Sequence, residues 1–141
     1  MPRTTIPWMA LLLAFTMLAF AQKPVIKKAP APQTSPASGS EMYKSYCAVC
    51  HGTDGKGNGP AVSALKVPPP DLTTLARRNQ GKYPESRVYQ AIKGEASLPA
   101  HGSKDMPMWG PVFRSLSKDD QAVVQLRISN LTKYIEAMQV K

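Results

Sequence analysis

The sequence lacks several features that would point to common protein classes. It has no internal repeat and no long segment of alternating polar and apolar residues, so a repeat protein and an extended β-sheet are not expected. No nucleic-acid-binding motif occurs, which argues against a nucleic-acid partner. There are only two cysteines and two histidines. A zinc site usually needs four ligands, and His101 lies far from the other three candidates along the chain.

The N-terminus carries an apolar run that is short for a membrane span. Arg3 precedes the run at residues 6–21, and Ala19-Phe20-Ala21 matches the small-x-small pattern that signal peptidase cuts after. We therefore expect a signal peptide over residues 1–21 and a periplasmic or secreted protein that begins near Gln22. The alternative is an uncleaved anchor, which would tether the same domain to the membrane outside the cytoplasm.

The next 19 residues, 22–40, are rich in proline, lysine, serine and alanine. Because they offer little apolar area to bury, we expect a disordered linker there and a single folded domain over residues 41–141. That domain has 14 basic and 9 acidic residues, a formal charge of +5. A basic surface favours acidic partners or an anionic membrane surface.

Both cysteines belong to one short motif, Cys47-Ala-Val-Cys50-His51. One helical turn can present both thiols to the two vinyl groups of haem, and the adjacent histidine then falls under the iron, so this spacing is the attachment pattern of a c-type haem. Two alternative functions of the motif account for fewer of its residues. A redox-active cysteine pair expects a strand before the motif, whereas the preceding segment looks helical, and a zinc site lacks its other ligands.

Several helices are expected around this motif. A short amphipathic helix capped by Ser40 should lead into the cysteines, and a glycine-rich loop over residues 52–59 follows them. Asp71 should cap a helix after three prolines, and Pro84 and Gly94 should bound another. Ser117 and Asp120 should open a long final helix with an apolar stripe.

A second axial ligand is expected in the segment Asp105-Met-Pro-Met-Trp-Gly110, which proline and glycine mark as a loop. Met106 precedes Pro107 and is therefore biased to an extended backbone, which favours it as the distal ligand. Met108 and His101 remain alternatives, and methionine also commonly fills gaps in cores. Trp109 is expected to pack at the edge of the haem.

Five parts of the chain now combine into one pattern: the Cys47–His51 motif, the loop HGTDGKGNGP, the segment PPPDL, the segment MPMWG and the last helix. With this pattern the chain resembles the class I cytochromes c of the bacterial single-haem type. The resemblance implies a small all-α fold wrapped around one covalent haem, with the first and last helices crossing beside it. It also implies that haem is bonded to Cys47 and Cys50 and that the iron is held by His51 and Met106.

The function that the resemblance implies is electron transfer without substrate turnover. The expected role is a monomeric carrier that shuttles single electrons between membrane or periplasmic redox partners, such as acidic proteins or respiratory-chain complexes. Peripheral membrane association is compatible with its charge. The alternative is a haem enzyme or a gas or peroxide sensor whose sixth iron ligand is labile.

Overall fold

The structure, a computed structural model, describes residues 31–95 and 106–140. These residues form helices and loops, and within the described ranges no strand occurs, which confirms the all-α prediction. The elements in chain order are α1 (Gly39–Met42), the π-helical turn η1 (Tyr43–Cys47), α2 (Ala48–His51), the 3₁₀ turns η2 (Val62–Ala64) and η3 (Leu72–Thr74), α3 (Leu75–Arg78), α4 (Glu85–Lys93), α5 (Trp109–Leu116) and α6 (Gln121–Ala137).

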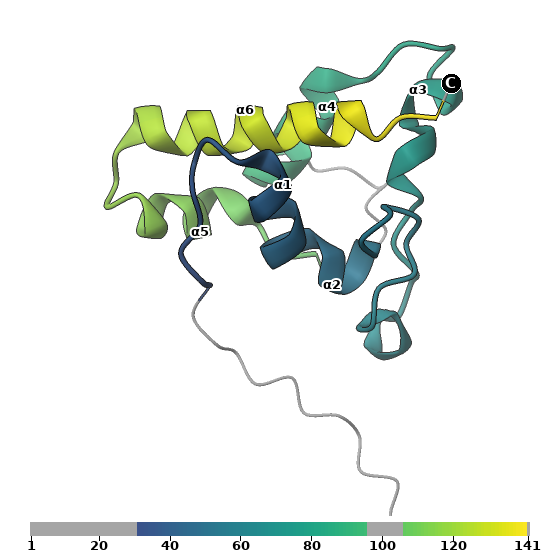
Figure 1. Ribbon diagram of the computed structural model, residues 1–141, viewed down its shortest axis with the longest axis horizontal. Coiled ribbons are helices and arrows are strands. Elements are labelled where there is room, and N and C mark those ends of the chain that lie inside the picture. The colour runs from purple at the N-terminus through teal and green to yellow at the C-terminus, as the bar shows by residue number, and fades with distance from the viewer. Residues whose placement is uncertain (1–30, 96–105, 141) are drawn as a thin grey trace, which may run out of the picture.

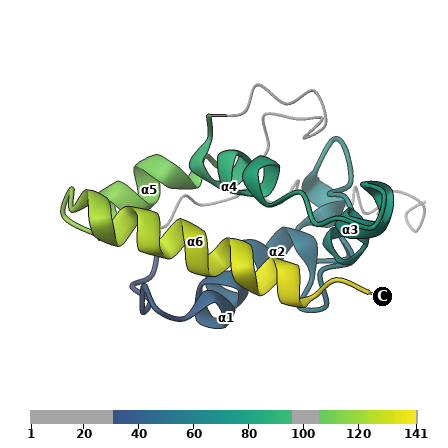
Figure 2. The same cartoon turned by 90° about the horizontal axis from the view of Figure 1, so that it is seen from above.

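The long helix α6 organises the fold, and α1, α4 and α5 all contact it (Figure 1). Figure 2 shows α4 and α5 along one side of α6, with α1 on the other. Gly39 permits the close crossing of α1 and α6, because a Cβ there would lie 2.8 Å from the Cβ of Tyr134. The first and last helices therefore cross as expected.

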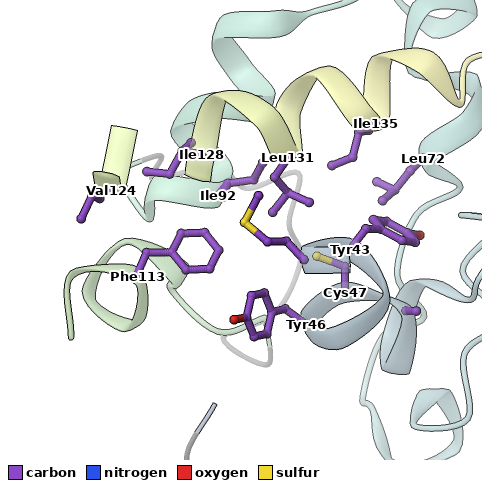
Figure 3. Close-up of a cluster of buried hydrophobic side chains, with 12 residues drawn as sticks. Tyr43, Tyr46, Cys47, Leu72, Ile92, Phe113, Val124, Ile128, Leu131 and Ile135 are labelled. Carbon is purple, nitrogen blue, oxygen red and sulfur yellow. The ribbon is translucent and has the colours of Figure 1, made fainter. Parts of the chain in front are cut away.

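The hydrophobic core lies between these helices (Figure 3). Helix α6 contributes a row of buried side chains that face Met42, Tyr43 and Tyr46 from the first helical segment. The row from α6 consists of Val124, Ile128, Leu131 and Ile135. These four residues of the apolar stripe predicted for the last helix therefore form the core, whereas Leu126, which the stripe also included, is 45% exposed.

The folded unit extends further towards the N-terminus than residue 41. Thr34 is buried, and its side chain and carbonyl oxygen accept hydrogen bonds from Arg127 of α6. The carbonyl oxygen of Pro36 accepts another from Asn130. The predicted disordered linker is thus wrong for residues 31–40, because these long-range bonds tie them to α6. The predicted signal peptide and residues 22–30 of the linker lie outside the described residues.

Two local predictions about helix ends are corrected. The first helix is capped by Ser38, whose hydroxyl accepts from the backbone N–H of Glu41, and Ser40 lies inside the helix. Asp120 alone caps α6 through Ala122 and Val123, because Ser117 instead ends the preceding helix.

The sequence predicts a loop through Gly110 and no helix directly after it, whereas α5 begins at Trp109 and includes Gly110 and Pro111. Both residues fall in its first turn, where the backbone N–H that proline lacks has no partner within the helix anyway. The other predicted helix ends are correct: Asp71 caps η3, and α4 begins directly after Pro84 and ends at Gly94, which has a left-handed conformation. Among the described residues, no helix combines the length and apolar character that a membrane span requires.

Candidate functional site

A cavity of about 320 Å³ opens beside the Cys47–His51 motif. This volume is in the range of small-molecule and cofactor sites. Four separate parts of the chain make most of its wall: the cysteine motif, the proline segment 68–70, α4, and the three residues Met106, Pro107 and Trp109 before and at the start of α5. Leu72, Ile92 and Ile135 add apolar side chains. The cavity therefore collects residues that lie far apart in the sequence.

The two cysteines line this cavity as free thiols. Cys47 is buried, and burial raises its pKa to about 12, with a smaller contribution from neighbouring Cys50. Burial also raises the pKa of Cys50. Both groups are therefore uncharged thiols at neutral pH. This disfavours the redox-active pair, which depends on a thiol whose pKa is lowered.

The alternative of a zinc site is not supported by the part of the chain that the structure describes. Among those residues, no group of three or more His, Cys, Asp or Glu side chains is arranged so that it could hold a metal ion. His101 lies outside the described residues.

His51 ends α2 and is 7% exposed, with its side chain lining the cavity. The glycine-rich loop folds back beneath it: the N–H of Gly57 donates to the His51 carbonyl (2.8 Å), and the N–H of Gly59 donates to the Cys50 carbonyl (3.1 Å). The loop then meets the next segment, where the N–H of Leu72 donates to the carbonyl of Gly55 (2.7 Å). The loop thus holds the cysteine motif against the opposite wall.

The structure separates the two methionines that the sequence left as alternatives. Met106 is partly buried and lines the cavity, together with Pro107 and Trp109. Met108 is 62% exposed and lies against Gly94, outside this cavity. The cavity therefore brings Met106 and His51 together, and it does not include Met108.

An aromatic cluster supports one side of the cavity. Tyr46 and Trp109 line it, with ring centroids 5.1 Å apart, and Phe113 lies behind them at 5.6 and 5.9 Å. Trp109 is therefore a packed aromatic at the cavity, as expected. Tyr46 was not identified as a site residue by the sequence analysis.

Two guanidinium groups, those of Arg78 and Arg87, stand among the mostly apolar lining. Arg78 also donates to the carbonyl oxygens of Asp71 and Thr74, which fixes its position. Neither residue has a local sequence signal for a place at the cavity, because their approach depends on how α3 and α4 fold over it.

The residues present fit haem c. Two thiols stand at attachment spacing, an imidazole and a thioether line the same space, apolar walls surround it, and guanidinium groups suit carboxylates such as the haem propionates. A family model described as cytochrome c matches residues 36–138. No curated protein and no solved structure gave a match.

Proposed function

The chain belongs to the cytochrome c family, which binds haem c covalently and generally transfers electrons, and from this premise we propose that it is an electron carrier with His51 and Met106 as the axial ligands of the haem iron. The observation that carries the proposal is the shared cavity. Cys47, Cys50, His51 and Met106 all line it, although Met106 is more than fifty residues from the cysteine motif.

Each of these residues has a distinct task. Haem c, when bound, takes up and releases one electron at its iron, and it changes little in doing so when both axial positions are filled. Cys47 and Cys50 hold the group through thioether bonds, and His51 supplies an imidazole nitrogen. Met106 supplies a thioether, which favours the reduced state relative to a second imidazole. The apolar walls limit the access of water, and Arg78 and Arg87 offer positive charge to carboxylates.

The proposal extends to location and partners. The N-terminal sequence supports export, so we place the protein in the periplasm or outside the cell, where it acts as a monomer between membrane-bound or acidic redox proteins. The end of α3 supports an acidic partner, because Arg77 and Arg78 are exposed and Arg78 with Asn79 borders the cavity. A basic surface of this kind orients an approaching acidic protein.

The ligand assignment is tested by replacing each methionine separately. The ferric wild-type protein should show the weak far-red absorption band of sulfur bonded to iron. Met106→Ala should abolish this band and let the reduced protein bind carbon monoxide. Met108→Ala is the matched control and should leave both properties unchanged, because Met108 lies outside the cavity. A lost band in Met108→Ala with a silent Met106→Ala would refute the assignment.

The same measurement separates a carrier from a haem enzyme or gas sensor. A filled sixth position keeps exogenous ligands away from the iron, so the reduced wild-type spectrum should not change when carbon monoxide is added. A wild-type protein that binds carbon monoxide readily would favour the enzyme or sensor over the carrier.

A further inference from the structure

Arg127 of α6 is a buried cation. It is 3% exposed, and its guanidinium donates three hydrogen bonds: from Nη1 to the Thr34 hydroxyl (3.0 Å), from Nη2 to the Thr34 carbonyl (2.9 Å) and from Nε to the Ser117 hydroxyl (3.3 Å). All three acceptors are neutral oxygens. Among the described residues, no carboxylate forms an ion pair with Arg127. Each guanidinium nitrogen has a hydrogen-bond partner, but these bonds leave a full positive charge inside the protein.

This charge lies directly behind the aromatic wall of the cavity. The guanidinium carbon of Arg127 is 6.0 Å from the ring centroid of Phe113. Phe113 contacts Tyr46 and Trp109, and both of these line the cavity. Figure 3 shows Phe113 and Tyr46 on neighbouring elements of the core. Two side-chain layers at most therefore separate the guanidinium from the cavity.

A hydrogen-bonded chain links the same charge to the cavity wall. Arg127 donates to the Thr34 hydroxyl, which is 2.8 Å from the Tyr46 hydroxyl, and Tyr46 donates to the Pro32 carbonyl (2.6 Å). Because the Tyr46 proton goes to Pro32, the Thr34 proton is directed at the Tyr46 oxygen. The segment 31–38 thus covers Arg127 and keeps solvent from screening its charge.

Burying an unpaired charge is unfavourable, and an apolar side chain of similar length would pack against Phe113 without that cost. A buried cation does, however, act strongly on a nearby centre that changes charge, because screening in the interior is weak. Haem iron is such a centre, since its ferric form carries one more positive charge than its ferrous form.

We propose that Arg127 raises the reduction potential of the haem by destabilising the ferric form. The step is a one-electron reduction of ferric to ferrous iron by an external electron donor, and no bond to Arg127 is made or broken. The inference rests on the proposed haem site. Arg127 does not touch the cavity itself, so it acts at a distance and is no ligand.

A redox titration with mediator dyes, followed by the haem absorption bands, tests this. Arg127→Met removes the charge but keeps an apolar stem and should lower the midpoint potential. Arg127→Lys keeps the charge and should retain most of the wild-type value. Ser117→Asp places a carboxylate where the Ser117 hydroxyl now accepts from Arg127, and it should also lower the potential. Ser115→Asp adds the same charge at an exposed position of α5 and should shift it less.

The inference is overturned if Arg127→Met keeps the wild-type potential, or if Arg127→Met and Arg127→Lys lower it equally, since packing would then be responsible. If Arg127→Met does not fold, Ser117→Asp decides, because it retains Arg127. Equal shifts in Ser117→Asp and Ser115→Asp would also overturn it. Failure of the proposed function is distinguishable: the wild type would then carry no stained haem after denaturing electrophoresis, or would show no one-electron wave.

Discussion

Gly57 is the residue where the glycine-rich loop comes closest to the proline segment. Its backbone is left-handed, with φ of 79°, and a Cβ there would collide with the carbonyl oxygen of Pro69. The same residue donates to the His51 carbonyl. Because Gly57 has no side chain, the loop can approach the proline segment closely, and this approach sets the distance between His51 and the opposite wall of the cavity.

Replacement of Gly57 should be more destabilising than its conformation alone explains. Gly81→Ala is the matched control, because Gly81 has nearly the same φ of 81° and its Cβ would meet no atom within 4 Å. Left-handed backbone should cost each variant about 1 to 2 kcal/mol. Overpacking against Pro69 should lower the unfolding free energy of Gly57→Ala by about 1 to 3 kcal/mol more. Denaturant unfolding of the haem-loaded protein measures both, and equal losses would contradict this role for Gly57.

At the scale of an element, the turn η3 begins at a carboxylate that the structure holds in its charged form. The Thr73 hydroxyl donates to Asp71 at 2.6 Å and the Thr73 N–H at 2.8 Å. The hydroxyl bond lowers the pKa of Asp71 most, burial opposes it, and the N–H bond, Arg78 and Lys56 lower the pKa further. This cap positions Leu72, which lines the cavity.

Because the pKa of Asp71 is lower in the folded chain than in the unfolded chain, its charge stabilises the fold above the unfolded pKa. That contribution disappears as the pH falls through the folded pKa. The difference in unfolding free energy between wild type and Asp71→Asn should therefore be largest near neutral pH and shrink on acidification. NMR titration of the Asp71 carboxyl provides the direct measurement.

Thr73→Val supplies the control for this cap, since it keeps the side-chain shape and removes only the hydroxyl donor. The pKa of Asp71 should rise in this variant. An unchanged pKa would show that the Thr73 hydroxyl is not the main cause of the shift.

At the scale of the whole molecule, the charge distribution concerns the proposed partner. The chain has 18 basic and 9 acidic residues. Arg77 and Lys82 are exposed near the end of α3, beside the cavity-lining Arg78 and Asn79, whereas Lys133 is exposed on α6. Lys104, two residues before Met106 in the sequence, lies outside the described residues.

Electron transfer to an acidic redox protein should be steered by these charges. Stopped-flow rates should fall steeply with rising salt, because exposed charges are screened beyond about 10 Å at 0.1 M. Arg77→Glu should slow association more than Lys133→Glu, which makes the same change of charge on α6. Rates that change neither with salt nor with charge reversal would rule out electrostatic steering and would indicate an uncharged docking surface.

The sequence by itself determined the features that short-range chemistry fixes. The spacing of Cys47, Cys50 and His51 predicts covalent haem because both thiols and the imidazole must reach one group from a single helical turn. The Asp71 cap and the Gly94 end of α4 were likewise predictable, since each depends on hydrogen bonds or φ angles within a few residues.

Only the tertiary structure decided what depends on contacts between distant segments. It places Met106 in the cavity and Met108 outside it, although both stand in one short motif. It also joins Thr34 to Arg127 across 93 residues, which moves the domain boundary and buries a cation behind the cavity wall. Sequence patterns carry no such information, because a side chain's burial and electrostatic surroundings are set by whichever distant elements the fold brings against it.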